Sequence, residues 1–235
     1  TGNGTVSGSG AYAAGATVAL TATPAVGSNF VGWSPSPCAP SFTMPASDLT
    51  CTATFNLNSY TVTATAGANG SIAPVSPTVN HGETTTFTVT PNVGYAATVT
   101  GCGGTLSGTT YTTGPITADC TVNASFTLKT YTVTTIAGPN GGITPVSPTV
   151  SHGEIVTFTV SPNEGYTASV GGCGGTLSGN AYITAPIVAA CTISVSFQAA
   201  TYTVTATAGA NGGISPATRT VSHGATTTFT VTPNV

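Results

Sequence analysis

Charged side chains are nearly absent from this 235-residue sequence, since only 3% of its residues are Asp, Glu, Lys or Arg. An ordinary globular protein has about 25%. The formal net charge is −3, and so weak a field does not steer nucleic acid, an anionic membrane surface or a charged substrate toward the chain. No hydrophobic run approaches the length of a membrane-spanning helix. We therefore expect no nucleic-acid partner and no membrane insertion of this segment.

Helical hydrophobic stripes are missing as well, although hydrophobic residues make up 40% of the chain. That share is too high for a disordered segment. The hydrophobic residues alternate with threonine: in TFTVTP, Phe87 and Val89 lie on one side and Thr86, Thr88 and Thr90 on the other. Alternation with a period of two is typical of strands with one buried face. The sequence therefore predicts an all-β protein.

The sequence repeats itself at a fixed interval. Tyr60, Tyr131 and Tyr202 open the segments YTVTATAGANG, YTVTTIAGPNG and YTVTATAGANG, which lie 71 residues apart (131 − 60 and 202 − 131). Such a period predicts an array of like units. We expect a divergent repeat lacking its first strand over 1–59, repeats over 60–130 and 131–201, and a truncated repeat over 202–235. Because the final VTPNV stops within the motif, we expect the sequence to be a piece of a longer chain.

Turn residues divide each repeat into short strands, of which we predict six. Asn-Gly pairs at residues 69–70, 140–141 and 211–212 favour tight turns that need positive φ. Proline residues near the ends of the alternating segments confine these strands to edges and ends. The predicted fold is a tandem array of small antiparallel β-sandwich-like modules, with one disulfide in each complete module.

The cysteines form no closely spaced CxxC pair, which disfavours a metal site. They occur two to a repeat, at Cys38 and Cys51, Cys102 and Cys120, and Cys173 and Cys191. Pairing within each repeat is the favoured arrangement; free thiols and a metal site including the repeated histidine are the alternatives. A disulfide closing so short a loop contributes about 3 kcal/mol. Disulfides predict a location outside the cytosol, in an oxidising space.

One eleven-residue motif occurs three times with its histidine and glycine unchanged. It reads HGETTTFTVTP at 81–91, HGEIVTFTVSP at 152–162 and HGATTTFTVTP at 223–233. A catalytic histidine needs an orienting carboxylate, and Glu83 and Glu154 give way to Ala225 in the third copy. A turn before a strand, with glycine supplying the unusual φ, explains the motif better. We expect no catalytic, cofactor-binding or metal-binding residue, no cofactor, and no enzyme activity.

Residues 3–55 contain NGTVSGSGAYAAGATVALTATPAVGSNFVGW and then FTMPASDLTCTATF. This order of an NG turn, a G-x-x-V-x-L-x-A-x-P strand, an F-x-G-W strand and F-x-M-P before a closing A-x-F resembles the divergent internalin-B-type repeat, also called the Listeria–Bacteroides repeat. The next two repeats keep part of the pattern, including Gly82, Phe87 and Pro91, but GCGGTLSG replaces F-x-G-W. The resemblance implies modules of bacterial surface or secreted proteins that have no enzymatic activity of their own.

Two functions are compatible with this sequence. The first is a non-catalytic structural protein, either a stalk or a self-assembling surface filament. Exposed threonine rows favour lateral association because uncharged strand edges lack the lysines that prevent pairing; the same rows are also compatible with plain β propensity or with an ice-binding face. The second is an adhesin that binds glycan or a partner protein, with Tyr95 and Tyr166 as candidate contact residues. Both tyrosines are also compatible with packing in the core.

Overall fold

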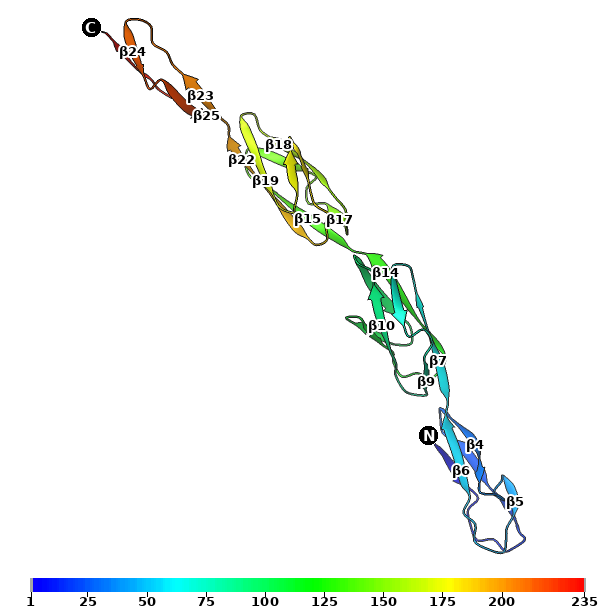
Figure 1. The fold of residues 1–235 in the computed structure, drawn as a ribbon. Coiled ribbons are helices and arrows are strands. Elements are labelled where there is room, and N and C mark those ends of the chain that lie inside the picture. The colour runs from blue at the N-terminus through cyan, green and yellow to red at the C-terminus, as the bar shows by residue number, and fades with distance from the viewer. Residues whose placement is uncertain (1, 235) are drawn as a thin grey trace. The chain divides into compact units, whose positions relative to one another are not determined.

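The computed structural model describes residues 2–234, and within them every regular element is a strand (Figure 1). The prediction of an all-β fold is confirmed. The chain divides into two compact units, Thr1–Thr127 and Leu128–Val235. Each unit is described by itself below.

Repeat two (residues 60–130) is a sandwich of two four-stranded sheets. One sheet has the order β11-β14-β7-β9 and the other β12-β13-β10-β8. The strands of the first sheet are β7 (Ser59–Ala66), β9 (Thr78–Asn80), β11 (Tyr95–Thr100) and β14 (Cys120–Leu128). Those of the second are β8 (Gly70–Ala73), β10 (Thr86–Pro91), β12 (Thr105–Ser107) and β13 (Thr110–Thr112).

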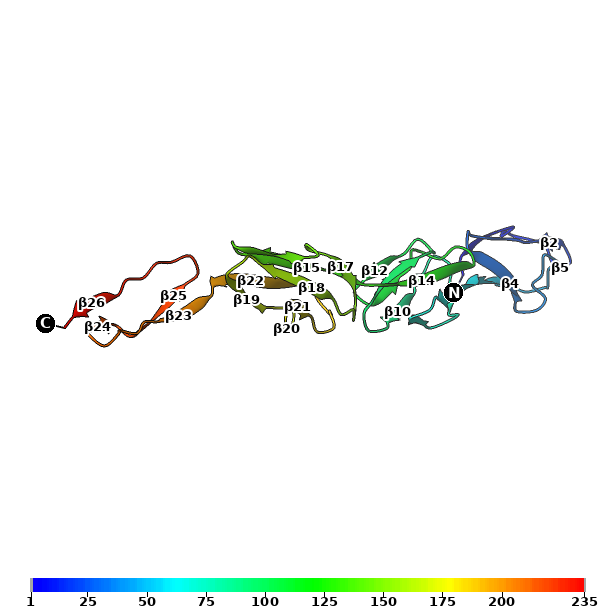
Figure 2. The same cartoon turned by 90° about the horizontal axis from the view of Figure 1, so that it is seen from above.

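Repeat three (residues 131–201) has the same two sheets, with the orders β17-β15-β22-β19 and β16-β18-β21-β20; its strands can be followed in Figure 2. The first sheet contains β15 (Thr130–Ala137), β17 (Thr149–Ser151), β19 (Tyr166–Gly171) and β22 (Cys191–Ala199). The second contains β16 (Gly141–Thr144), β18 (Thr157–Pro162), β20 (Thr176–Ser178) and β21 (Ala181–Ile183). The expected six strands per repeat is therefore too low. Three-residue strands such as β9 and β12 are too short to show alternation in the sequence.

The first and last strands of each complete repeat pair in parallel. In repeat two Cys120 of β14 pairs with Val62 of β7, and in repeat three Cys191 of β22 pairs with Val133 of β15. The sequence predicted antiparallel neighbours, and the other strand pairs are antiparallel, as between β10 and β8. Because the first and last strands run in one direction, the chain enters a repeat at one end of the sheet and leaves it at the other.

Each complete repeat has its own hydrophobic core between the two sheets. The inward residues predicted from alternation, Phe87 and Val89, are 1% exposed, which confirms the period-two interpretation. Their threonine neighbours in β10 are exposed. The other buried members in repeat two are Val62, Ala64, Ile72, Val79, Tyr111, Ile116, Val122 and Ala124. Repeat three buries Val133, Ile143, Val150, Phe158, Val160, Tyr182, Ile187, Ile193 and Val195.

The two flanking segments form smaller, two-stranded sheets. In repeat one (residues 1–59) the strands are β1 (Gly4–Ser7), β2 (Thr17–Ala19), β3 (Thr21–Pro24), β4 (Ser28–Ser34), β5 (Ser41–Thr43) and β6 (Thr52–Leu57). They pair as β1-β3, β2-β5 and β4-β6. Repeat four (residues 202–235) contains the pairs β23-β25 and β24-β26. Its strands are β23 (Thr201–Thr205), β24 (Gly212–Ser215), β25 (Thr218–Ser222) and β26 (Thr230–Pro233).

In the complete repeats the positive φ predicted for the Asn-Gly turns belongs to the asparagine. Asn69 and Asn140 have φ of 71° and 74°, whereas Gly70 and Gly141 are not in this region. Glycine is required at these positions for another reason. A Cβ on Gly70 would lie 2.3 Å from Cε1 of Phe126. The aromatic ring of the closing strand therefore lies directly on the glycine backbone.

Candidate functional site

The histidine of the repeated motif lies in a tight turn. In repeat two the N–H of Glu83 donates to the carbonyl of Asn80 at 3.1 Å, which closes a turn over residues 80–83. Gly82 has φ of 81°, a conformation that glycine adopts without the steric cost of a side chain. The N–H of Gly82 donates to the carbonyl of Ile116 at 2.7 Å. The turn is thereby fixed to the segment that precedes the closing strand.

The acidic residue of the motif bonds to the residue before the histidine. Oε2 of Glu83 accepts a hydrogen bond from Nδ2 of Asn80 at 3.3 Å, and Oε2 of Glu154 accepts one from the N–H of Ser151 at 2.9 Å. With Ala225 in the third copy, the turn still closes by a backbone bond. The carboxylate therefore supports the turn and does not orient the imidazole as a general base would require.

The imidazole ring lies beside the tyrosine that opens its own repeat. The ring centroids of Tyr60 and His81 are 6.0 Å apart with an interplanar angle of 54°, and those of Tyr131 and His152 are 6.0 Å apart at 53°. Within the described residues, the Nδ1 atoms of His81 and His152 are buried and have no hydrogen-bond partner. Packing against the tyrosine therefore accounts for the ring position better than a polar interaction.

The same ring also contacts the preceding repeat. A Cβ on Gly27 would lie 1.9 Å from Cδ2 of His81, and a Cβ on Gly165 would lie 2.1 Å from Cγ of His223. Each of these glycines ends a turn of the preceding repeat, with φ of 75° and 78°. The histidine is thus a contact residue between consecutive repeats in both places, and this contact was not predicted from the sequence.

Tyr166, one of the two tyrosines predicted as surface contacts, is partly buried. Its ring centroid lies 6.2 Å from that of His223, with an interplanar angle of 63°. Tyr95 has the equivalent position in repeat two and is also partly buried. One face of Tyr166 is therefore used within the chain, and a ligand role for either tyrosine stays a prediction.

A family model described as the divergent InlB B-repeat domain matches four consecutive segments, residues 1–59, 60–130, 131–200 and 202–235. The chain belongs to the divergent InlB B-repeat family. This confirms the resemblance found in the sequence, and the family is one of repeats in bacterial surface proteins. No curated protein and no solved structure matches the chain.

Within this InlB-type chain all six cysteines are paired. The disulfides join Cys38 to Cys51, Cys102 to Cys120 and Cys173 to Cys191, with Cα–Cα distances of 5.6, 5.7 and 5.5 Å. Each bond lies within one repeat, as the fold prediction stated. Residues 2–234 contain no group of three or more His, Cys, Asp and Glu that could hold a metal ion. They also contain no helix long and apolar enough to cross a membrane.

Equivalent shallow cavities lie beside the disulfides of repeats two and three, with volumes of about 350 and 280 Å³. The first includes Asp119, whose Oδ1 accepts a hydrogen bond from the N–H of Thr61 at 2.8 Å. The second has Ala190 at the same position. Because the carboxylate occurs in one copy and already has a backbone partner there, these cavities do not present a repeated set of polar groups to a ligand.

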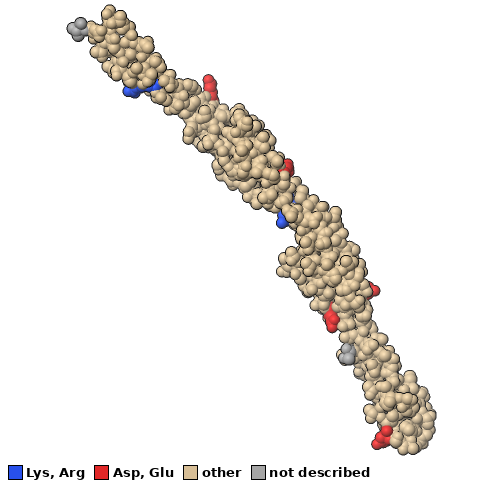
Figure 3. All heavy atoms as spheres, in the orientation of Figure 1, with Lys and Arg blue, Asp and Glu red and all other residues tan. Residues whose placement is uncertain are grey.

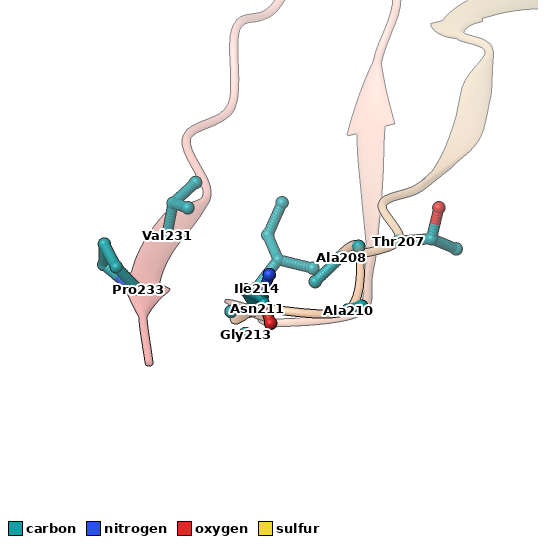
Figure 4. Close-up of a pocket in the computed structure, with 10 residues that line it drawn as sticks. Thr207, Ala208, Ala210, Asn211, Gly213, Ile214, Val231 and Pro233 are labelled. Atoms are coloured by element: carbon teal, nitrogen blue, oxygen red, sulfur yellow. The ribbon is translucent and has the colours of Figure 1, made fainter. Parts of the chain in front are cut away.

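A larger cavity of about 440 Å³ lies in repeat four (Figure 4). Ala208, Ile214, Val231 and Pro233 are among its lining residues. In the complete repeats the corresponding glycine turn is covered by the aromatic ring of the closing strand, as Phe197 covers Gly141. At Gly212 the nearest neighbour of a Cβ is instead the carbonyl oxygen of Thr232, at 3.1 Å. The cavity is therefore the counterpart of an aromatic packing site in the complete repeats.

Proposed function

We propose that this chain is a non-catalytic structural segment of an extracellular bacterial protein, acting as a stalk or as the subunit of a surface filament. One observation carries the proposal. The two complete repeats share strand order, parallel closing pair and disulfide position. Their shared acidic residues, Glu83 and Glu154, bond to their own turns, and Asp119 beside the disulfide of repeat two is replaced by Ala190 in repeat three. The features common to both repeats are those that build and connect modules.

An extracellular location is supported by the three disulfides, which persist in oxidising compartments, and by membership of a family of surface-protein repeats. Small modules have little core to stabilise them. A bond that closes a loop of 18 residues, as between Cys102 and Cys120, restricts the unfolded chain and adds about 3 kcal/mol. The same bonds make a module suited to conditions outside the cell.

The parallel pairing of the first and last strands supports a stalk. Since Thr121 pairs with Thr63 and Ala124 with Ala66 in one direction, β14 leaves the sheet at the end opposite to that at which β7 enters it. Each added repeat therefore increases the distance spanned by the chain. This connection suits a spacer, whose length depends on the number of modules.

The filament version rests on the uncharged sheet edges. β11 and β19 lie at the edges of their sheets, and their sequences, YAATVT and YTASVG, contain no charged residue. Figure 3 shows how few charged side chains lie on the visible face. Edge strands of this kind can pair with another molecule because nothing repels it.

Analytical ultracentrifugation and negative-stain microscopy over a range of concentrations test both versions. The stalk predicts monomeric particles whose length increases when a further copy of residues 60–130 is inserted. The filament predicts end-to-end or lateral polymers that appear above a threshold concentration. Compact monomers whose maximum dimension does not change on insertion of a repeat contradict the proposal in both forms.

The adhesin alternative is favoured by hydroxyl-rich outer faces on the sheets. Thr86 and Thr88 in β10 are exposed and pair with Thr112 and Thr110, which places several hydroxyl groups on one face of the sheet. A glycan array probed with the whole chain and with its Tyr95→Ala variant separates this function from the structural one. Binding that is lost in the variant supports the adhesin, and an absence of binding removes it.

A further inference from the structure

Consecutive repeats are connected through the residue that precedes the first strand. In Thr1–Thr127 this residue is Asn58, whose N–H donates to the carbonyl of Gly27 in repeat one at 2.8 Å. Its own carbonyl accepts the N–H of His81 in repeat two at 2.8 Å. One residue thus bonds to a turn in each of two repeats.

The same arrangement occurs in Leu128–Val235. The N–H of Ala200 donates to the carbonyl of Gly165 at 2.8 Å, and the carbonyl of Ala200 accepts the N–H of His223 at 2.8 Å. Because both bonds use backbone atoms, they tolerate the change from asparagine to alanine. We call each set of three residues a joint: Gly27, Asn58 and His81, and Gly165, Ala200 and His223.

We propose that the histidine ring of the joint couples the folding of consecutive repeats. The turn that contains the joint glycine is the docking surface of the preceding repeat, and the following repeat docks on it with its tyrosine and histidine. The partner is a module of the same family. The ring lies against the glycine backbone, whose carbonyl accepts one of the two hydrogen bonds of the joint. Cooperativity between modules is the ordinary consequence of such nearest-neighbour contacts in repeat proteins.

The contact between the joint glycine and the histidine ring requires a residue without a side chain. Only a residue without Cβ leaves room for the ring, since a Cβ on Gly27 would collide with Cδ2 of His81. At Gly15, in the same repeat, φ is 82° and no atom lies within 4 Å of an added Cβ, so that backbone conformation alone accounts for glycine there. At Gly27 the collision with the ring is added to this requirement. A comparison of the two glycines therefore separates the effect of backbone conformation from that of the contact.

The ring acts by its shape and apolar surface. Nδ1 of His81 is buried without a hydrogen-bond partner, so that replacing the imidazole by a benzene ring removes an unsatisfied polar atom. Tyr60 packs on the ring from within the same repeat. In the second joint His223 has Tyr202 on its own repeat and Tyr166 on the preceding one, with centroid distances of 6.5 and 6.2 Å.

The test uses the whole chain and follows hydrogen exchange of the Asn58 amide. Its bond to the Gly27 carbonyl lies within repeat one, beside the glycine that His81 of repeat two contacts. The variants are His81→Ala, His81→Phe, Gly27→Ala and the double variant Gly27→Ala/His81→Ala. Gly15→Ala is the matched control, because Gly15 has a similar positive φ of 82° in the same repeat as Gly27 but no atom within 4 Å of an added Cβ. Exchange of the Val122 amide in β14 reports whether repeat two itself remains folded.

We expect His81→Ala and Gly27→Ala to accelerate exchange at Asn58 by ~10-fold or more, since local opening then needs less free energy. His81→Phe is expected to retain the protection of the original protein. Adding Gly27→Ala to His81→Ala is expected to change the rate no more than Gly15→Ala does. Val122 remains protected in each case. Equal effects of Gly27→Ala and Gly15→Ala, or loss of protection in His81→Phe with Val122 still protected, overturn the proposal.

This inference rests on the proposed structural role for its biological use, but its outcome is independent of assembly. If His81→Ala leaves the Asn58 amide protected while the chain still forms stalks or filaments, the proposed coupling through the joint is wrong and the proposed function stands. If His81→Ala accelerates exchange at Asn58 but the chain forms neither stalks nor filaments, the coupling through the joint is supported and the proposed structural function is wrong.

Discussion

The Tyr111 hydroxyl donates a hydrogen bond to the carbonyl of Gly101, the residue before Cys102. Tyr182 and Gly172 make the same interaction in repeat three. Tyr111 is completely buried, and a buried phenol needs a partner for its hydroxyl. The bond fixes the loop that contains the disulfide to the centre of the core.

Removing this hydroxyl should weaken repeat two. We expect Tyr111→Phe to lower the free energy of unfolding by about 1–2 kcal/mol, because the Gly101 carbonyl loses a buried donor. Tyr12→Phe is the control, since the Tyr12 hydroxyl also donates to a carbonyl, that of Gly8 at 2.9 Å, but is exposed. Denaturant unfolding monitored by tyrosine fluorescence measures both. Equal destabilisation by the two variants contradicts a special role for the buried bond.

Loss of a disulfide should act mainly on its own repeat. We expect the Cys102→Ser/Cys120→Ser variant to lose about 3 kcal/mol of stability, as estimated for a loop of this length. The Cys38–Cys51 bond, with a sequence separation of 13 against 18 for Cys102–Cys120, should give a similar loss in repeat one. Hydrogen exchange resolved by repeat locates each effect. A variant whose stability is unchanged shows that the bond does not stabilise its module.

The sequence predicted the local pattern well because alternation depends on neighbouring residues. Phe87 and Val89 lie inward as expected, and Gly82 has the positive φ that its turn requires. The parallel pairing of β7 and β14 was not predicted, since it joins segments separated by most of the repeat. No local pattern encodes a strand partner at that separation.

The role of the histidine was predicted only in part. Its turn was recognised from the adjacent glycine, but the contact with Gly27 joins two different repeats. A repeated sequence gives the same residue at each position without showing which neighbouring copy it contacts. The packing contact of the Asn-Gly glycine was not predicted for a similar reason, because Phe126, which lies on Gly70, belongs to the closing strand.

The ring of the closing strand gives a prediction with a matched control one residue away. A Cβ on Gly141 would lie 2.3 Å from Cε1 of Phe197, whereas one on Gly142 would have no neighbour within 4 Å. We expect Gly141→Ala to destabilise repeat three by about 1–3 kcal/mol through overpacking, and Gly142→Ala to have little effect. Thermal unfolding compares the two. Similar midpoints for both variants mean that the ring moves aside without cost.

Lateral association depends on the edge strands and should respond to a single charge at each edge. Thr98 and Ser169 are exposed on β11 and β19. A lysine on an edge strand opposes pairing with another chain, because pairing would bury the lysine charge or bring it close to a like charge. If filaments form through these edges, the Thr98→Lys/Ser169→Lys variant should require a concentration ~10-fold higher to associate. Thr88→Lys/Thr159→Lys is the control, with the same charge on the exposed faces of the internal strands β10 and β18. Light scattering against concentration measures the onset. Equal shifts in both variants attribute the change to net charge alone, and no shift in either excludes β11 and β19 as the contact.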